Sequence, residues 1–192
     1  MSFNKHVMMT VRACNYHISA LRHIRPVLSS DVAQRIACSI VESKLDYCNA
    51  LLHNTAITNI NRLQRVQNNL ARVVCNDRST ESAQLLQQLH WLPVDSRIKF
   101  KVAKLCYQAT TSGQPAYLAD MLKPYVQTRT LRSGSLDLLA VPPYKLQVAA
   151  RSFSAAAPRL WNTLPLNIRT APSVNSFKSR LKTYLFSQTF NL

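Results

Sequence analysis

The stretch ITNINRLQRVQNNLARVV, residues 57–74, decides the fold. Its apolar side chains recur every three or four positions, which is the spacing of residues on one face of an α-helix. A helix with such a face must bury it against other elements, so the stretch predicts a central helix in a helical core. The residues expected to point inward are Ile60, Leu63, Val66, Leu70 and Val73.

The segments before this helix repeat its pattern. A second helix is expected to begin at Ser30 or Asp31, because these residue types cap helices by accepting a hydrogen bond from the first turn. Its residues spaced by four are Val32, Ile36 and Ile40, and apolar residues continue from Leu45 to Leu52. A first helix, ending before Pro26, is predicted by the spacing of Phe3, Val7, Val11, Cys14, Ile18 and Leu21.

The segments after residue 74 predict shorter helices. One carries Leu85, Leu86 and Leu89, and Pro93 separates it from a longer helix over about Asp95–Thr110. A further short helix is expected within Pro115–Leu122. The chain has only two glycines, whereas sheet proteins with many tight hairpins need residues that accept positive φ. The predicted fold class is therefore mainly α.

From Pro124 the pattern changes, because six prolines fall between residues 124 and 172. Proline lacks a backbone donor and interrupts regular elements, so this region is expected to be irregular, with one or two short strands. One strand is expected at Leu138–Val141 and a helical turn or two at Phe153–Trp161. A last helix, capped by Ser173 and running through Phe186, would bury Val174, Phe177, Leu181 and Leu185. The predicted domains are a helical one over residues 1–113 and a C-terminal region over 114–192.

The chain is strongly basic. Its 192 residues hold 24 Lys and Arg against 8 Asp and Glu, a net charge of +16, and residues 97–192 hold 14 of the basic but only 2 of the acidic residues. Such an excess destabilises a compact fold unless an anionic partner offsets it. The charge therefore suggests nucleic acid, an anionic membrane surface or an acidic protein as a partner. With 47% hydrophobic residues, the chain is not a disordered basic tail.

The sequence shows no catalytic centre. It contains no phosphate-binding glycine loop, no nucleophile elbow and no pair of aspartates for two metal ions. Cys14 with His17, and Cys48 with His53, superficially resemble zinc-ligand pairs, but the first pair is expected inside a helix rather than across a tight loop. Buried thiols and surface histidines are the favoured interpretation, so we expect no catalytic residue, metal or cofactor.

The compartment follows from the same sequence. Five scattered cysteines, with no C-x-x-C, favour a reducing environment over a disulfide scaffold. The N-terminus does not resemble a signal peptide, and no apolar run is long enough to span a bilayer. We therefore expect a soluble protein of the cytoplasm or nucleus, with no membrane partner.

The basic residues gather on predicted helix faces. Stripes of cationic side chains on rigid helices suit the tracking of a phosphate backbone, although a single stripe is more often only a solvated face. Three stripes with few interleaved acids favour binding to the backbone of RNA or DNA. The candidate residues are Arg62, Arg65 and Arg72 in the first stripe, Arg97, Lys101 and Lys104 in the second, and Lys178, Arg180 and Lys182 in the third.

Aromatic residues offer a weaker indication. Aromatic rings can stack on bases, but no run alternates basic and aromatic residues as a single-strand platform would. For most of these rings a place in the core is favoured. The candidates are Tyr107, Tyr117, Tyr125, Tyr144, Phe153 and Trp161.

Five strings, in order, resemble the C-terminal part of reverse transcriptases from non-LTR (LINE) retrotransposons of the CR1/L2/jockey type. The final Ser173–Phe186 segment also resembles that family's usual ending, and the match covers essentially the whole chain. The strings are ALRHIRP (20–26), SKLDYCN (43–49), RLQRVQN (62–68), LHWLPV (89–94) and AAPRLWNTLP (156–165).

The resemblance implies that residues 1–113 correspond to the helical thumb of such an enzyme and that the rest is a post-thumb region. The family's catalytic [FY]-x-D-D signature would lie upstream, so neither RNA-directed DNA polymerase nor endonuclease chemistry is expected of this chain. The thumb's role, gripping the template–primer duplex by its backbone, points first to Arg62, Arg65 and Arg72. Trp161 would belong to a packing motif that docks the C-terminal region on the thumb.

Other interpretations stay open beside this one. The chain could be a helical protein-interaction module that exposes an apolar face, for which Val7, Val11, Ile18 and Leu21 are the natural candidates. It could also be a translated remnant of a transposable element without function. An enzyme of unknown type is a distant further alternative.

Overall fold

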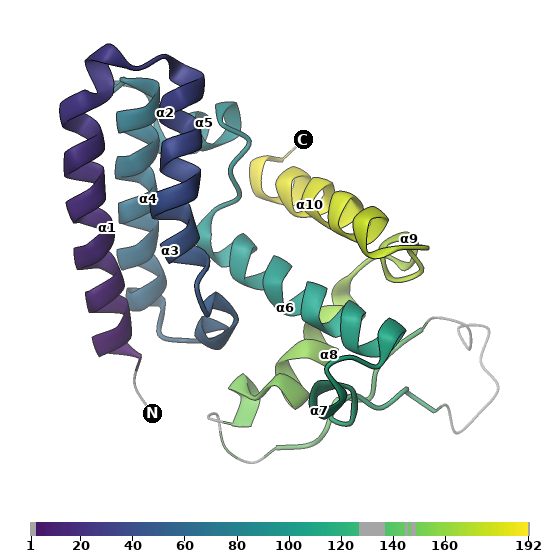
Figure 1. Ribbon diagram of the computed structural model, residues 1–192. Coiled ribbons are helices and arrows are strands. Elements are labelled where there is room, and N and C mark those ends of the chain that lie inside the picture. Colours follow the sequence, from purple (N-terminus) through teal and green to yellow (C-terminus); the bar gives the residue numbers. More distant parts are fainter. Residues whose placement is uncertain (1–2, 127–136, 145, 147–148, 192) are drawn as a thin grey trace. The chain divides into compact units, whose positions relative to one another are not determined.

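The computed structural model describes residues 3–126, 137–144, 146 and 149–191, and in this part the chain is mostly helical (Figure 1). The predicted mainly α fold class is thus confirmed. The chain forms two compact units, the first comprising Met1–Ile98 and Phe186–Leu192 and the second Lys99–Leu185. The division falls inside a helix, whereas the sequence placed a boundary after residue 113.

The first unit is a bundle around α4 (Ile57–Cys75), in which α1 (Asn4–Ile24) and α2 (Ser30–Ile36) run alongside α4 (Figure 1). A π-helical segment (Ala37–Glu42) continues α2 into α3 (Ser43–Asp46). The remaining helices of this unit are two 3₁₀ turns (Arg25–Val27 and Asn49–Leu52), α5 (Ser82–Gln88) and the start of α6 (Val94–Ser112).

The apolar face predicted for residues 57–74 forms the core of this unit. Leu63, Val66, Leu70 and Val73 are buried and Ile60 is half-buried. Opposite them lies the predicted face of α1, in which Val7, Ile18 and Leu21 are all at most 3% exposed. The hypothesis that this α1 face is an exposed surface for a protein partner is therefore wrong, because these side chains already pack in the bundle core.

The predicted face of α2 is shifted by one position. Val32 and Ile40 are 42% and 40% exposed, whereas Ala33, Ala37 and Val41 are buried. The small alanine side chains allow neighbouring helices to approach closely, and the shift is already present at Ala33, before the π-helical segment begins at Ala37. The cap is also one residue earlier than expected, since Ser29 Oγ accepts a hydrogen bond from the Val32 N–H.

The second unit contains α6 from Lys99 onward, α7 (Ala116–Ala119), a 3₁₀ turn (Ala149–Arg151), α8 (Phe153–Thr163), α9 (Leu166–Arg169) and α10 (Val174–Phe190) as far as Leu185. Phe177, Leu181 and Leu185 are buried, as the sequence predicts. The strand expected at Leu138–Val141 is reduced, within the described residues, to one isolated bridge between Pro124 and Leu139. The short α9 was not predicted.

An aromatic cluster holds this unit together. The ring of Phe177 stacks on that of Tyr107 at 4.3 Å between centroids and lies 6.1 Å from that of Trp161. The polar atoms are satisfied, because Tyr107 Oη donates to the Ala171 carbonyl at 2.7 Å and Trp161 Nε1 to the Asp137 carbonyl at 2.8 Å. The Trp161 segment therefore acts as a packing element within the second unit.

Replacing Tyr107 by phenylalanine is expected to lower the free energy of unfolding by about 1–3 kcal/mol, because the buried Ala171 carbonyl loses its donor. Denaturant unfolding followed by circular dichroism measures the loss. Tyr125→Phe is the matched control, since the Tyr125 side chain is 54% exposed, and its effect should stay within about 0.5 kcal/mol. Equal unfolding midpoints for Tyr107→Phe and the wild type would show that the hydrogen bond from Tyr107 to the Ala171 carbonyl does not stabilise the fold.

Candidate nucleic-acid interface

The first predicted stripe lies on α4 in the first unit. Arg62 and Arg65 are exposed and Arg72 is half-buried, and all three lie beside the buried face of Leu63, Val66 and Leu70. Ten residues of helix separate Arg62 from Arg72, which corresponds to about 15 Å along the axis. None of the three forms an ion pair with any residue that the structure describes. The stripe therefore presents three uncompensated guanidinium groups.

Arg97 differs from the other predicted residues, because its charge is already neutralised. Its guanidinium forms ion pairs with Glu42 and Asp46, and its Nε donates to Asp46 Oδ1 at 2.9 Å. Only 18% of the Arg97 side chain and 3% of the Glu42 side chain is exposed. Because two carboxylates already balance its charge, Arg97 attracts a phosphate less than the unpaired cations do, and it stands apart from the candidate interface.

The environment of Arg97 explains why the pairing persists. Burial raises the pKa of Glu42, and the charge of Arg97 and a hydrogen bond from Gln67 Nε2 offset part of this. Burial by itself would lower the pKa of Arg97, but the hydrogen bond to Asp46 and the charges of Glu42 and Asp46 raise it above its ordinary value. The arginine therefore stays charged as the counter-ion of a buried carboxylate.

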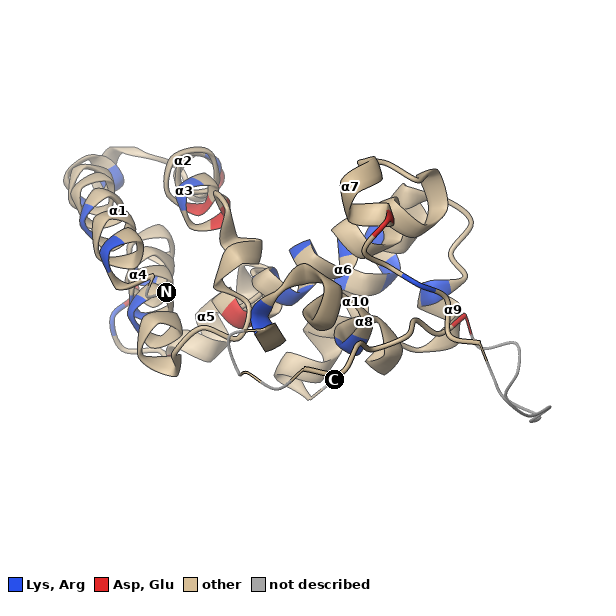
Figure 2. Ribbon diagram, turned by 90° about the horizontal axis from the view of Figure 1, so that it is seen from below, with Lys and Arg blue, Asp and Glu red and all other residues tan. Residues whose placement is uncertain are grey.

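Lys104 on α6 lies near two other lysines of the second unit, Lys101 on the same helix and Lys178 on α10. Burial lowers the pKa of Lys104, and the positive charges of Lys178 and Lys101 lower it further. All three side chains are half-buried, and none is ion-paired with a described residue. Figure 2 shows the basic residues along α6. The structure thus brings residues of two predicted stripes together around Lys104, and we call Lys101, Lys104 and Lys178 the lysine cluster.

The other two residues of the third stripe behave differently from each other. Lys182 is exposed and lies one turn from Lys178 on the same side of α10, so it extends the lysine cluster. Arg180 lies on the opposite flank of the helix, where its guanidinium donates to the Asn167 carbonyl. Lys182 therefore belongs with the lysine cluster, and Arg180 does not.

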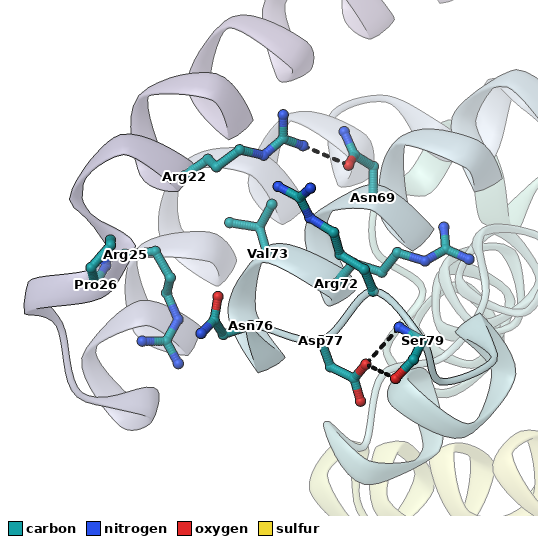
Figure 3. Close-up of a pocket in the computed structure, with 10 residues that line it drawn as sticks. Arg22, Arg25, Pro26, Asn69, Arg72, Val73, Asn76, Asp77 and Ser79 are labelled. Carbon is teal, nitrogen blue, oxygen red and sulfur yellow. Dashed lines mark hydrogen bonds between the residues drawn. The ribbon is translucent and has the colours of Figure 1, made fainter.

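A pocket of about 790 Å³ in the first unit was missed by the sequence analysis (Figure 3). Four arginines line it: Arg22 from α1, Arg25 from the 3₁₀ turn after it, Arg72 from α4 and Arg78 from the following loop. Only Arg72 was expected in a site. The signal in the sequence was weak, because Arg22 and Arg25 lie at the end of α1 and in the turn after it, whereas Arg72 and Arg78 lie about fifty residues further along the chain.

The aromatic candidates divide between core and surface. Tyr107 and Trp161 are buried, which agrees with the favoured core interpretation. Tyr117 and Tyr125 are 65% and 54% exposed, so they alone among the candidates present large open ring surfaces. Phe153 and Tyr144 are half-buried, and the Tyr144 ring lies 4.4 Å below the Arg159 guanidinium.

The side chains that could bind a metal ion or act as nucleophiles are dispersed or buried in the described part of the chain. In the described part of the chain, no three His, Cys, Asp or Glu side chains come together in a way that could hold a metal ion. Burial raises the pKa of Cys14 to about 11 and that of Cys106 to about 12, so both are neutral thiols in the core. Among the described residues, no helix is long and apolar enough to cross a membrane.

The candidate residues of both units are cations. They are guanidinium and ammonium groups on helices, and the second unit has 13 basic against 2 acidic residues in its sequence. Such groups recognise phosphate oxygens by charge and hydrogen bonding rather than by base identity. Comparisons of this chain with protein-family models, with curated proteins and with solved structures find no match.

Proposed function

We propose that this chain binds the backbone of RNA or DNA without regard to sequence. The α4 arginines (Arg62, Arg65 and Arg72) and the lysine cluster with Lys182 supply the contacts. The observation that carries the proposal is the lysine cluster, in which Lys101, Lys104 and Lys178 stand together with no carboxylate paired to them among the described residues. Like charges held together cost free energy unless an anion offsets them, and a phosphate backbone provides such anions.

We further propose that the chain corresponds to the thumb and post-thumb region of a LINE-type reverse transcriptase. The five ordered strings and the final helix support this, and a helical bundle that presents arginines on one helix suits the gripping of a template–primer duplex. The chain itself would supply no polymerase chemistry. Its neighbouring carboxylates Glu42 and Asp46 share the guanidinium of Arg97, so they are not a free pair for metal ions.

Fluorescence anisotropy with labelled RNA, DNA and an RNA–DNA hybrid, each in two unrelated sequences, tests the binding. If about five phosphates are contacted, log K should fall against log salt with a slope near −4 to −5, and the two sequences should bind alike. Size-exclusion chromatography of the same sample establishes that a monomer is being titrated. A salt-insensitive affinity, or no binding at low salt, would overturn the proposal.

A further inference from the structure

The arginine pocket combines concave shape with uncompensated charge. Its volume of about 790 Å³ lies in the range of small-molecule binding sites. Arg72 and Arg78 have no hydrogen-bond or ion-pair partner within the described part of the chain. Arg22 donates one N–H to the side-chain oxygen of Asn69, 2.9 Å away (Figure 3). A guanidinium has five N–H donors, so most donors of these three arginines remain for a ligand.

The acid in the pocket does not cancel this charge. Asp77 accepts hydrogen bonds from the N–H and Oγ of Ser79 and from the N–H and Oγ1 of Thr80, all between 2.6 and 3.1 Å. The four donors lower the pKa of Asp77, led by those of Thr80, and they occupy both carboxylate oxygens. Asp77 forms no ion pair with the described residues. The wall therefore keeps a net positive charge.

The C-terminal end of α4 is also covered. Unpaired carbonyls at such an end carry partial negative charge and would disfavour an anion. Here Arg25 Nε donates to the Val74 carbonyl at 2.9 Å, and the Asp77 N–H donates to the Arg72 carbonyl at 3.1 Å. The Asn76 N–H donates to the Val73 carbonyl at 3.2 Å. Arg25 thus has a positioning role, which leaves the other three arginines to meet an anion.

We propose that this pocket binds the terminal phosphate of a nucleic-acid strand. A phosphate monoester carries between one and two negative charges at neutral pH and three acceptor oxygens, whereas an internal phosphodiester carries one charge. Several guanidiniums facing one cavity suit the monoester, since arginine binds phosphate oxygens in pairs. A row of exposed cations along a helix, such as the α4 arginines, suits the successive phosphodiesters inside a strand instead.

The arrangement on α4 favours a strand end over a free phosphate metabolite. Arg72 is the last residue of the α4 stripe and also lines the pocket. If a nucleic-acid backbone runs along α4 past Arg62 and Arg65, the end of that strand would therefore reach the pocket. This inference rests on the proposed function. The α4 arginines are proposed to hold the interior of a strand, and the pocket is proposed to hold the end of that strand.

The test compares single strands that carry the same number of phosphate groups. One has a terminal phosphate, at the 5′ or the 3′ end, and the other is one nucleotide longer with hydroxyl ends. We expect the phosphorylated strand to bind at least about tenfold more tightly in anisotropy titrations. Arg78→Gln and Arg72→Gln should abolish the preference. Arg12→Gln, which removes an exposed charge on α1 outside the pocket, should keep it.

Each outcome separates this inference from the proposed function. Equal affinity for the two strands overturns the pocket assignment and leaves backbone binding intact, whereas no binding of either strand overturns both. Millimolar inorganic phosphate or a nucleoside monophosphate should remove the preference without displacing the hydroxyl-ended strand. If either displaces the phosphorylated strand completely, or if a phosphoserine peptide competes as well as the strand end, the assignment to a strand end is wrong. Unchanged circular dichroism of the Arg78→Gln variant shows that the fold is retained.

Discussion

Replacing Arg97 by alanine is expected to lower the free energy of unfolding by about 3–5 kcal/mol near neutral pH. The substitution leaves the Glu42 carboxylate, 3% exposed, without its cation. The hydrogen bond from Gln67 remains, but it does not replace a full charge in the bundle core. Denaturant unfolding monitored by circular dichroism measures the loss. The proposed nucleic-acid contacts do not include Arg97, so binding by the folded variant should keep the wild-type salt slope.

The deficit of Arg97→Ala should depend on pH. Burial raises the pKa of Glu42 in the folded protein above its ordinary value of 4.5. An acid with a raised folded pKa holds its proton more tightly when folded, so its contribution to stability is present below the unfolded pKa and is lost as pH rises through the folded one. Without Arg97 the pKa rises further. The difference between variant and wild type should therefore be largest near neutral pH and shrink as pH falls toward 4.5.

Two further variants control this result. Arg35→Ala removes an ion pair with Asp31 in which both side chains are largely exposed, and it should cost no more than about 0.5 kcal/mol. The double variant Glu42→Gln with Arg97→Ala removes the buried charge together with its partner, and it should recover part of the stability. If Arg97→Ala costs as little as Arg35→Ala, the pairing with Glu42 is not a buried counter-ion contact.

The same arginine shows how far the sequence could predict the site. A helical wheel correctly places Arg97, Lys101 and Lys104 on one face of α6, because helix geometry depends only on local spacing. It cannot show that Glu42 and Asp46, about fifty residues earlier, lie beside Arg97. The neutralised Arg97 therefore lies one turn from the unpaired Lys101 and two turns from the unpaired Lys104, and only the tertiary structure distinguishes them.

The same distinction between local spacing and tertiary contacts applies to the fold. The long helices α1, α4 and α6 could be predicted, because their apolar residues keep a regular helical spacing over many turns. The inward face of α2 could not, since small alanines at positions 33 and 37 are buried in place of the larger apolar residues beside them. The arginine pocket is lined by two stretches far apart in the sequence, residues 22–26 and 69–79, so no local pattern marks it.

The distribution of acids connects these findings. Arg35 and Arg97 in the first unit form ion pairs with Asp31, Glu42 and Asp46. In the second unit, the sequence offers only Asp120 and Asp137 against 13 basic residues. Most of the excess positive charge therefore lies in the unit with few carboxylates. The lysine cluster should accordingly dominate the electrostatic part of binding.

Replacing Lys101, Lys104 and Lys178 together by glutamine is expected to weaken RNA or DNA binding on the order of 10²-fold at about 0.1 M salt. Each phosphate contact contributes about 0.7–0.9 to the slope of log K against log salt, so the magnitude of the slope should fall by about two to three. Stability should not fall, because the substitution relieves repulsion among three ammonium groups. Anisotropy titrations over a range of salt concentrations, together with thermal unfolding, measure both effects.

The matched control removes the same charge elsewhere. Lys5, Arg12 and Lys44 are exposed residues of the first unit outside every proposed contact, and their triple glutamine variant loses three positive charges as well. If binding depends on net charge alone, the two triple variants should weaken it equally and reduce the slope by the same amount. If the lysine cluster holds phosphates directly, the control should keep most of the wild-type slope, because exposed charges that contact no phosphate contribute little to it. Equal losses would thus contradict a localised site, while an intact slope in the control and a reduced one in the cluster variant would place the phosphate contacts at α6 and α10.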